Sequence, residues 1–232
     1  MPFRYLLSCV LLLLYSGSAR AQARLEIAGG ATFTLGSLAR GEKAERQLLL
    51  RNTGSDSLVI KRVDASCGCT GTVLTSPRIP PGGTAALKIT FDSRNFSGAV
   101  HKTVTISSTA VNTPELVVNF TAEVIDEIIV TPPQFWVKDA EVGTAIPLSV
   151  RVKNQGPAPL QLANYRSSLE GLVLTLPTAP IPPGAEIELT ASFTPKKAVP
   201  FLAEGIFITT SNIHRPEIYI PVYGNTREFK FQ

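Results

Sequence analysis

The stretch that decides the fold is IPPGGTAALKITFD, residues 79–92, because IPPGAEIELTASFT follows 102 residues later at 181–194. In both copies a proline–glycine pair precedes apolar residues that alternate with polar ones. Proline presets φ and glycine accepts a positive φ, so this pair favours a tight turn. Alternation with a period of two is typical of a strand that buries one face. The stretch therefore predicts a turn and a half-buried strand, each used twice.

The same offset relates residues along most of the chain without a gap. Matched pairs include Phe33 and Phe135, Gly41 and Gly143, Asn52 and Asn154, Gly54 and Gly156, Phe91 and Phe193, and Ile106 and Ile208. A fixed offset indicates that one domain has been duplicated. We expect domains at residues 24–126 and 127–228, each of a common domain size, followed by a tail at 229–232.

Alternating apolar residues also occur at 116–122 and 146–152, and no window after the N-terminal segment has a helical stripe. Each copy offers about seven short strands, which is typical of an immunoglobulin-like sandwich. The predicted fold class is all-β, with two tandem immunoglobulin-like β-sandwiches; a barrel is the second candidate. The cysteine and tryptophan signature of antibody domains is missing, since Trp136 is the only tryptophan.

The predicted joint between the domains is AEVIDEIIVTPPQF, residues 122–135. Pro132 and Pro133 are expected to stiffen it, because proline-rich linkers are semi-rigid. The sequence thus predicts a semi-rigid rod. Within this region we interpret Asp126 and Glu127 as a solvated hinge and Trp136 as a packing residue near the joint.

The first residues have the pattern of an export signal. Arg4 precedes the apolar run YLLSCVLLLLY, and cleavage options follow at Ala19-x-Ala21 and Ala21-x-Ala23. The run is shorter than the roughly 20 residues that span a bilayer. We expect a signal peptide at residues 1–23, a periplasmic or extracellular location, and no integral membrane span.

Charge argues against nucleic acid as a partner. The 22 basic residues less Arg4 and Arg20 leave 20, against 18 acidic residues, so the processed chain is nearly neutral. Its lysines and arginines are scattered among acidic residues. A basic surface of the kind that binds DNA or RNA is therefore not expected.

The stretch VDASCGCTG, residues 63–71, places Cys67 and Cys69 one glycine apart, and Cys9 is expected to leave with the signal. In an oxidising compartment the pair could form a disulfide, which requires Cα atoms within about 7 Å. We rank a local disulfide or an inert pair first and thiol–disulfide exchange below it. The second copy has Leu169 and Gly171 at the equivalent positions, so the fold itself does not require the cysteines.

Metal binding and catalysis rank lower. Two soft thiolates would favour copper(I), whereas a structural zinc site needs about four ligands. His101 and His214 are the two histidines, and they lie in different copies. His101 could approach Cys67 only if the strand beginning near Ala99 lies beside the turn. No catalytic motif is present, so we predict no enzyme activity, no metal and no cofactor.

Four stretches together resemble a known family: FTLG, RNTGSDSLVIKRVDASCGCT, IPPGGTAALKITFD and ELVVNFTAEV, between about residues 33 and 124. They resemble the uncharacterised exported bacterial family called domain of unknown function 1573. Its Ser-Cys-Gly-Cys-Thr signature falls on Ser66, Cys67, Gly68, Cys69 and Thr70. Members are similar to the immunoglobulin-like domains of major sperm protein and Hydin, which implies a scaffold or binding module.

Two functional hypotheses remain. The first is a non-catalytic scaffold of the cell envelope that presents sheet edges and loops to a protein or glycan, with strand addition as one mechanism. The second is thiol-redox or copper(I) handling at Cys67 and Cys69.

Overall fold

The computed structural model describes residues 20–228, which form strands joined by turns and contain no helix. The predicted all-β fold class is confirmed. Most of the predicted signal peptide and the whole predicted tail, residues 229–232, lie outside the described residues. Within the described part of the chain there is accordingly no apolar helix long enough to cross a bilayer.

The first sandwich contains two sheets, with strand orders β1-β3-β7-β5 and β2-β9-β8-β4-β6. Strands β2 and β9 run parallel, and the other paired strands of this sandwich run antiparallel. The strands are β1 (Leu25–Ala28), β2 (Thr32–Ala39), β3 (Lys43–Asn52), β4 (Leu58–Ala65), β5 (Thr70–Leu74), β6 (Arg78–Ile79), β7 (Thr84–Asp92), β8 (Gly98–Ser108) and β9 (Glu115–Ile125).

The second sandwich repeats this arrangement, with strand orders β10-β12-β15-β14 and β11-β17-β16-β13. Its parallel pair, β11 with β17, corresponds to β2 with β9. In place of the short strand β6, the second sandwich has a single β-bridge between Leu160 and Ile181. The strands are β10 (Ile128–Thr131), β11 (Phe135–Glu141), β12 (Ile146–Asn154), β13 (Leu162–Ser167), β14 (Leu172–Thr175), β15 (Glu186–Phe193), β16 (Leu202–Thr210) and β17 (Glu217–Arg227).

The buried apolar residues form two clusters, one in each sandwich, and neither cluster contains residues of the other. The alternation in the opening stretch is confirmed, because Leu87, Ile89 and Phe91 are buried, as are Leu189 and Phe193 in the second copy. Fully burying one such side chain stabilises the folded state by about 1.5–3 kcal/mol. Each sandwich therefore has its own hydrophobic core.

The joint is shorter and less solvated than predicted. Strand β9 ends at Ile125 and β10 begins at Ile128, so the backbone passes from one sandwich to the other through two residues, Asp126 and Glu127. The Asp126 side chain is only 13% exposed. It forms ion pairs with Arg40 of the first sandwich, at 2.6 Å, and with Arg215 of the second. The interpretation of these acids as a solvated hinge was wrong, since the Asp126 carboxylate is paired with one arginine from each sandwich.

Burial affects the pKa of the arginine that the second sandwich supplies to this joint. Burial lowers the pKa of Arg215, and the nearby Arg40 acts in the same direction, while the Asp126 carboxylate opposes the shift. The Arg215 guanidinium also donates to the Ile128 carbonyl oxygen at 3.0 Å. Glu127 accepts a hydrogen bond from the Asn212 side chain at 2.6 Å. The joint is thus fixed by side-chain contacts and not by proline.

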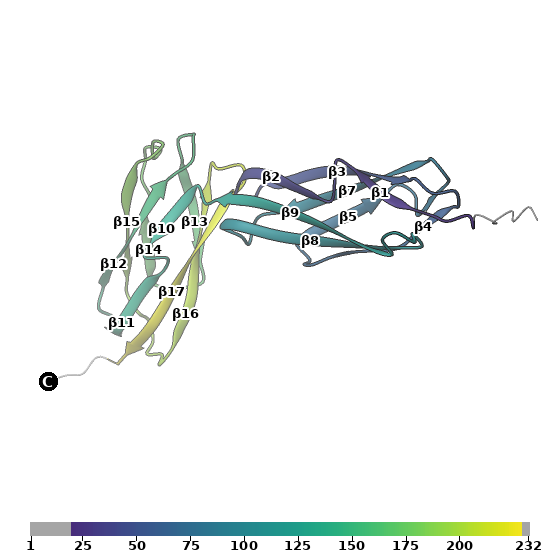
Figure 1. Ribbon diagram of the computed structural model, residues 1–232. Helices are drawn as coiled ribbons and strands as arrows, with labels where there is room; N and C mark the ends of the chain where they lie inside the picture. The colour runs from purple at the N-terminus through teal and green to yellow at the C-terminus, as the bar shows by residue number, and fades with distance from the viewer. Residues whose placement is uncertain (1–19, 229–232) are drawn as a thin grey trace, which may run out of the picture.

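Two further expectations were wrong. Pro132 and Pro133 lie between β10 and β11, where the chain passes from one sheet of the second sandwich to the other, so they are not at the joint. Trp136 is 60% exposed on β11 and does not pack in a core. Figure 1 shows the two sandwiches meeting at a bend and not in line, which modifies the predicted rod.

Candidate functional site

The cysteine turn, residues 66–69, is the crossover between the two sheets of the first sandwich. Strand β4 belongs to the sheet that contains β8, whereas β5 belongs to the sheet that contains β7. Cys67 follows the first of these strands and Cys69 precedes the second. The pair therefore lies where the chain leaves one sheet and joins the other.

Backbone hydrogen bonds attach each end of the turn to a different sheet. The Ser66 N–H donates to the Thr103 carbonyl oxygen at 2.9 Å, and the Thr103 N–H donates to Ser66 Oγ at 3.1 Å. On the other side, the Asp92 N–H donates to the Cys69 carbonyl oxygen at 2.9 Å. The turn closes when the Thr70 N–H donates to the Cys67 carbonyl oxygen at 3.2 Å.

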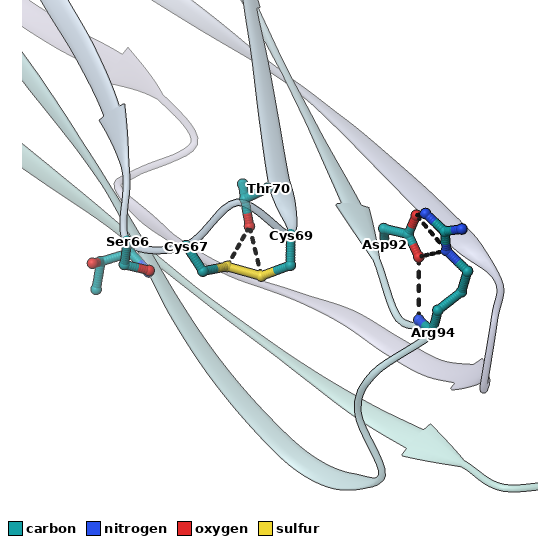
Figure 2. The surroundings of a disulfide bond; sticks show 7 residues. Ser66, Cys67, Cys69, Thr70, Asp92 and Arg94 are labelled. Carbon is teal, nitrogen blue, oxygen red and sulfur yellow. Dashed lines mark hydrogen bonds and ion pairs between the residues drawn. A yellow bond between two sulfur atoms is a disulfide. The ribbon is translucent and has the colours of Figure 1, made fainter. Parts of the chain in front are cut away.

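The structure joins Cys67 and Cys69 by a disulfide, with their Cα atoms 5.2 Å apart (Figure 2). This separation lies within the range that a disulfide requires. Both cysteines are half-buried, and Cys69 packs against the first core. The buried Thr70 places its hydroxyl 3.6 Å from the Cys67 sulfur and 3.8 Å from the Cys69 sulfur. The Thr70 hydroxyl is thus within hydrogen-bonding distance of both sulfurs.

An acidic and a basic side chain lie close to this turn. Asp92 ends β7, and its carboxylate accepts from Arg94 Nε at 3.0 Å (Figure 2). The hydrogen bond from Arg94 lowers the pKa of Asp92, while partial burial acts in the opposite direction. Asp92 is therefore an anion at neutral pH. The predicted motif omitted both residues, because they lie more than twenty positions further along the chain.

The second sandwich builds the equivalent turn without sulfur. The Leu172 N–H donates to the Leu169 carbonyl oxygen at 3.4 Å, and the Thr194 N–H donates to the Gly171 carbonyl oxygen at 2.9 Å. They are equivalent to the hydrogen bonds donated by the Thr70 and Asp92 N–H groups, 102 residues earlier in the chain. Leu169 packs against the second core. Gly171 has a φ of 83°, and a Cβ atom there would overlap the Thr194 carbonyl group.

The structure does not gather the other candidate ligands around the sulfurs. Strand β8 does lie beside the turn, but His101 is exposed and faces Thr121 of β9 in the register of the sheet. His214 belongs to the second sandwich, where its backbone lies against Gly41 at the joint. In residues 20–228, no group of three or more His, Cys, Asp and Glu side chains is arranged to hold a metal ion.

Residues 27–124 match the family described as protein of unknown function (DUF1573), which confirms the predicted resemblance for the first sandwich. No curated protein sequence matches the chain. Among solved structures, a protein of unknown function from Porphyromonas gingivalis W83 is similar at 15% identity, covering 87% of this chain and 99% of that chain, with a TM-score of 0.35.

Two other similar structures are domains of named proteins. The PapD-like domain 7 of human CEP192 has 15% identity and a TM-score of 0.39, covering 54% of this chain and 97% of that chain. The IG1 and IG2 domains of DIP-gamma have 13% identity and a TM-score of 0.34, covering 89% of this chain and 99% of that chain. At these identities the similarity concerns the all-β fold alone.

Proposed function

We propose that this chain, whose residues 27–124 match a family of unknown function, is an exported, non-catalytic binding scaffold of the bacterial cell envelope. The observation that carries the proposal is the pair of open sheet edges that follow the two crossover turns. Strand β5 pairs only with β7, and β14 pairs only with β15, among the described strands. Each is short and outermost in its sheet.

These edges have the properties of a strand-addition site. Val73 of β5 and Val173 of β14 are each 61% exposed. The outer N–H and C=O groups of an edge strand are available to a second chain, and proteins usually protect such edges with charge, with proline or by keeping the strand very short. Neither β5 nor β14 contains a charged residue or a proline. An extended protein segment with alternating apolar side chains would fit both edges.

The joint gives the scaffold a defined geometry. Asp126 is held between Arg40 and Arg215, so the two edges keep a fixed relation to each other. Two weak sites at a fixed separation can bind one partner more tightly than either site alone.

Site-specific photo-crosslinking in exporting cells tests this function. A photo-reactive residue is placed at Val73 or Val173, and at Lys61 as an exposed position outside both edges. The proposal predicts that discrete adducts form at the two edge positions and not at the control position. If all three positions give the same adducts, or if none gives an adduct, the proposed function is wrong.

Thiol–disulfide exchange, or copper(I) handling by the reduced pair, is the second candidate function. The half-exposed disulfide and the Thr70 hydroxyl beside it favour this candidate. A partner thiolate would bond to one sulfur while the Cys67–Cys69 bond breaks, and the departing thiolate could accept a hydrogen bond from Thr70. Intact mass after incubation with glutathione, and copper content of the reduced protein, test it. Neither a mixed disulfide nor bound copper is expected if the chain acts only as a scaffold.

A further inference from the structure

Aromatic side chains gather on the outer face of one sheet of the second sandwich. We define the aromatic face as six residues from β11, β13, β16 and β17. They are Trp136, Arg166, Phe207, Tyr219, Pro221 and Tyr223. Trp136 lies opposite Tyr223, and Phe207 lies opposite both Tyr219 and Arg166. The face is therefore continuous across four neighbouring strands.

The rings of this face pack on one another and on the sheet. The Phe207 and Tyr219 ring centroids are 4.8 Å apart, and the Arg166 guanidinium lies 3.9 Å from the Phe207 centroid. A Cβ atom at residue 205 would overlap the Tyr219 ring, so Gly205 allows this ring to lie over the strand. Trp136 and Tyr219 nevertheless remain 60% and 50% exposed. The contacts with Phe207 and Gly205 hold the exposed Tyr219 ring in place before any ligand arrives.

The first sandwich shows that the fold does not need these rings. At the same six positions, 102 residues earlier, it has Thr34, Asp64, Thr105, Val117, Asn119 and Thr121. The strand pairing is the same, since Thr34 lies opposite Thr121 and Thr105 lies opposite Val117. Exposed aromatic side chains that the fold does not require are typical of binding sites.

We propose that the aromatic face binds a neutral glycan chain of pyranose units. Charge supports a neutral ligand, because the Arg166 guanidinium beside Phe207 is paired with the Glu217 carboxylate at 2.8 Å. The apolar C–H faces of pyranose rings stack on aromatic rings, and their hydroxyl groups reach polar groups at the margin. A strand-forming peptide is not favoured here, because the backbone groups of this face are paired within the sheet.

The dimensions suit an oligosaccharide more than a single sugar. Tyr219 and Tyr223 are four residues apart on β17, which corresponds to about 13 Å along a strand. A shallow, open depression lies beside Tyr219 and Phe207. Its margin includes Glu204 and Ser168, which hydrogen-bond to each other and can exchange that bond for sugar hydroxyl groups.

This inference rests on the proposed function only in treating the chain as a binding module. The test is titration of the full exported chain with chitohexaose and cellohexaose. Trp136 is the only tryptophan, so its fluorescence reports directly on the face. We expect a saturable change in emission with at least one of the two glycans. By calorimetry, Trp136→Thr and Tyr219→Val, which install the residues of the first sandwich, should each weaken binding at least tenfold.

Ile213→Ala is the matched control, because Ile213 is 86% exposed in the same sandwich but lies in the connection between β16 and β17, away from the residues beside Tyr219 and Phe207. Its affinity should equal that of the unaltered chain. The inference is overturned if neither glycan changes the fluorescence or releases heat, or if Ile213→Ala weakens binding as much as Trp136→Thr. Crosslinking at Val73 and Val173 is unaffected by that outcome, so failure of the glycan site and failure of the scaffold are distinguishable.

Discussion

Asn154 repeats three side-chain hydrogen bonds of Asn52 at a distance of 102 residues along the chain. The Asn52 amide donates to the carbonyl oxygens of Asp56 and Ile79 at 2.7 and 2.9 Å, and its Oδ1 accepts from the Gly54 N–H at 3.0 Å. The partners of Asn154 are Ala158, Ile181 and Gly156, at 2.8, 2.8 and 3.0 Å. Both asparagines are buried. The same three hydrogen bonds of a buried asparagine thus occur in each sandwich.

Replacing either asparagine by alanine should destabilise its own sandwich. Asn154→Ala leaves the Gly156 N–H and the Ala158 carbonyl oxygen without their partner, while the Ile181 carbonyl oxygen keeps its bond from the Leu160 N–H. An unsatisfied buried group costs about 1–3 kcal/mol. We expect a loss of about 2–4 kcal/mol in the free energy of unfolding of the second sandwich. Urea titration followed by Trp136 fluorescence measures this, because that tryptophan belongs to the second sandwich.

Asn164→Ala, at an exposed position of β13, is the control and should change the stability of the second sandwich by less than about 0.5 kcal/mol. Asn52→Ala should leave the Trp136 transition near its original midpoint, while increasing hydrogen exchange in β3, β7 and β9. Equal exchange increases in both sandwiches after either substitution would contradict separate cores.

Arg215→Ala should loosen the joint. The substitution removes the cation that the second sandwich supplies to Asp126, and it leaves that carboxylate paired with Arg40 alone. We expect solution scattering to show a broader distribution of distances between the sandwiches, with little change in the unfolding of either. Arg227→Ala removes an ion pair with Glu141 inside the second sandwich and serves as the control. An identical scattering profile for Arg215→Ala and the unaltered chain would contradict a joint fixed by Asp126.

Acid should weaken the first sandwich through Asp92. The hydrogen bond from Arg94 lowers the pKa of Asp92 in the folded state below its ordinary value of 3.8. Stability from this contact is fully present above pH 3.8 and is lost as the pH falls through the lower, folded-state pKa. Asp92→Asn should therefore flatten the decline in stability below pH 4, as measured by urea midpoints at several pH values. A decline as steep as that of the unaltered chain would contradict this assignment.

The contacts of Gln22 and Ala23 revise the expected signal peptide of residues 1–23. If the chain is exported as proposed, its processed form should begin at Gln22 and not at Arg24. The Gln22 N–H donates to Ser55 Oγ at 3.2 Å, and its carbonyl oxygen accepts from the Ser55 N–H at 2.9 Å. Ala23 is buried against the first core. Cleavage after Ala23 would remove these contacts, so we predict cleavage after Ala21. N-terminal sequencing of the exported protein checks this, and a first residue of Arg24 would contradict it.

The repeating framework could be predicted from sequence because its determinants are local and occur twice. The alternation at Leu87, Ile89 and Phe91 specified buried strand faces, and the turns at Asn52 and Asn154 marked equivalent points in both copies. The cysteine turn was also visible, since all its motif residues are consecutive. These signals do not depend on how strands from distant parts of the chain meet.

The ion pairs of the joint and the aromatic face were missed because both are assembled from distant residues. Asp126 and Arg215 are 89 positions apart, and neither residue alone indicates burial of charge. The aromatic face did leave a signal, since Tyr219 and Tyr223 occupy positions of β17 that a half-buried strand turns outward. Trp136 could be assigned to the same face only after the parallel pairing of β11 with β17 was known.

On the proposed function, the chain acts by binding and does not depend on chemistry at its two cysteines. The most direct test is the crosslinking experiment at Val73 and Val173 repeated in a chain that carries Cys67→Ser and Cys69→Ser. We expect a folded first sandwich and the same adducts in similar yield. Loss of the adducts from a chain that remains folded would contradict a binding scaffold and favour redox or copper chemistry at the turn.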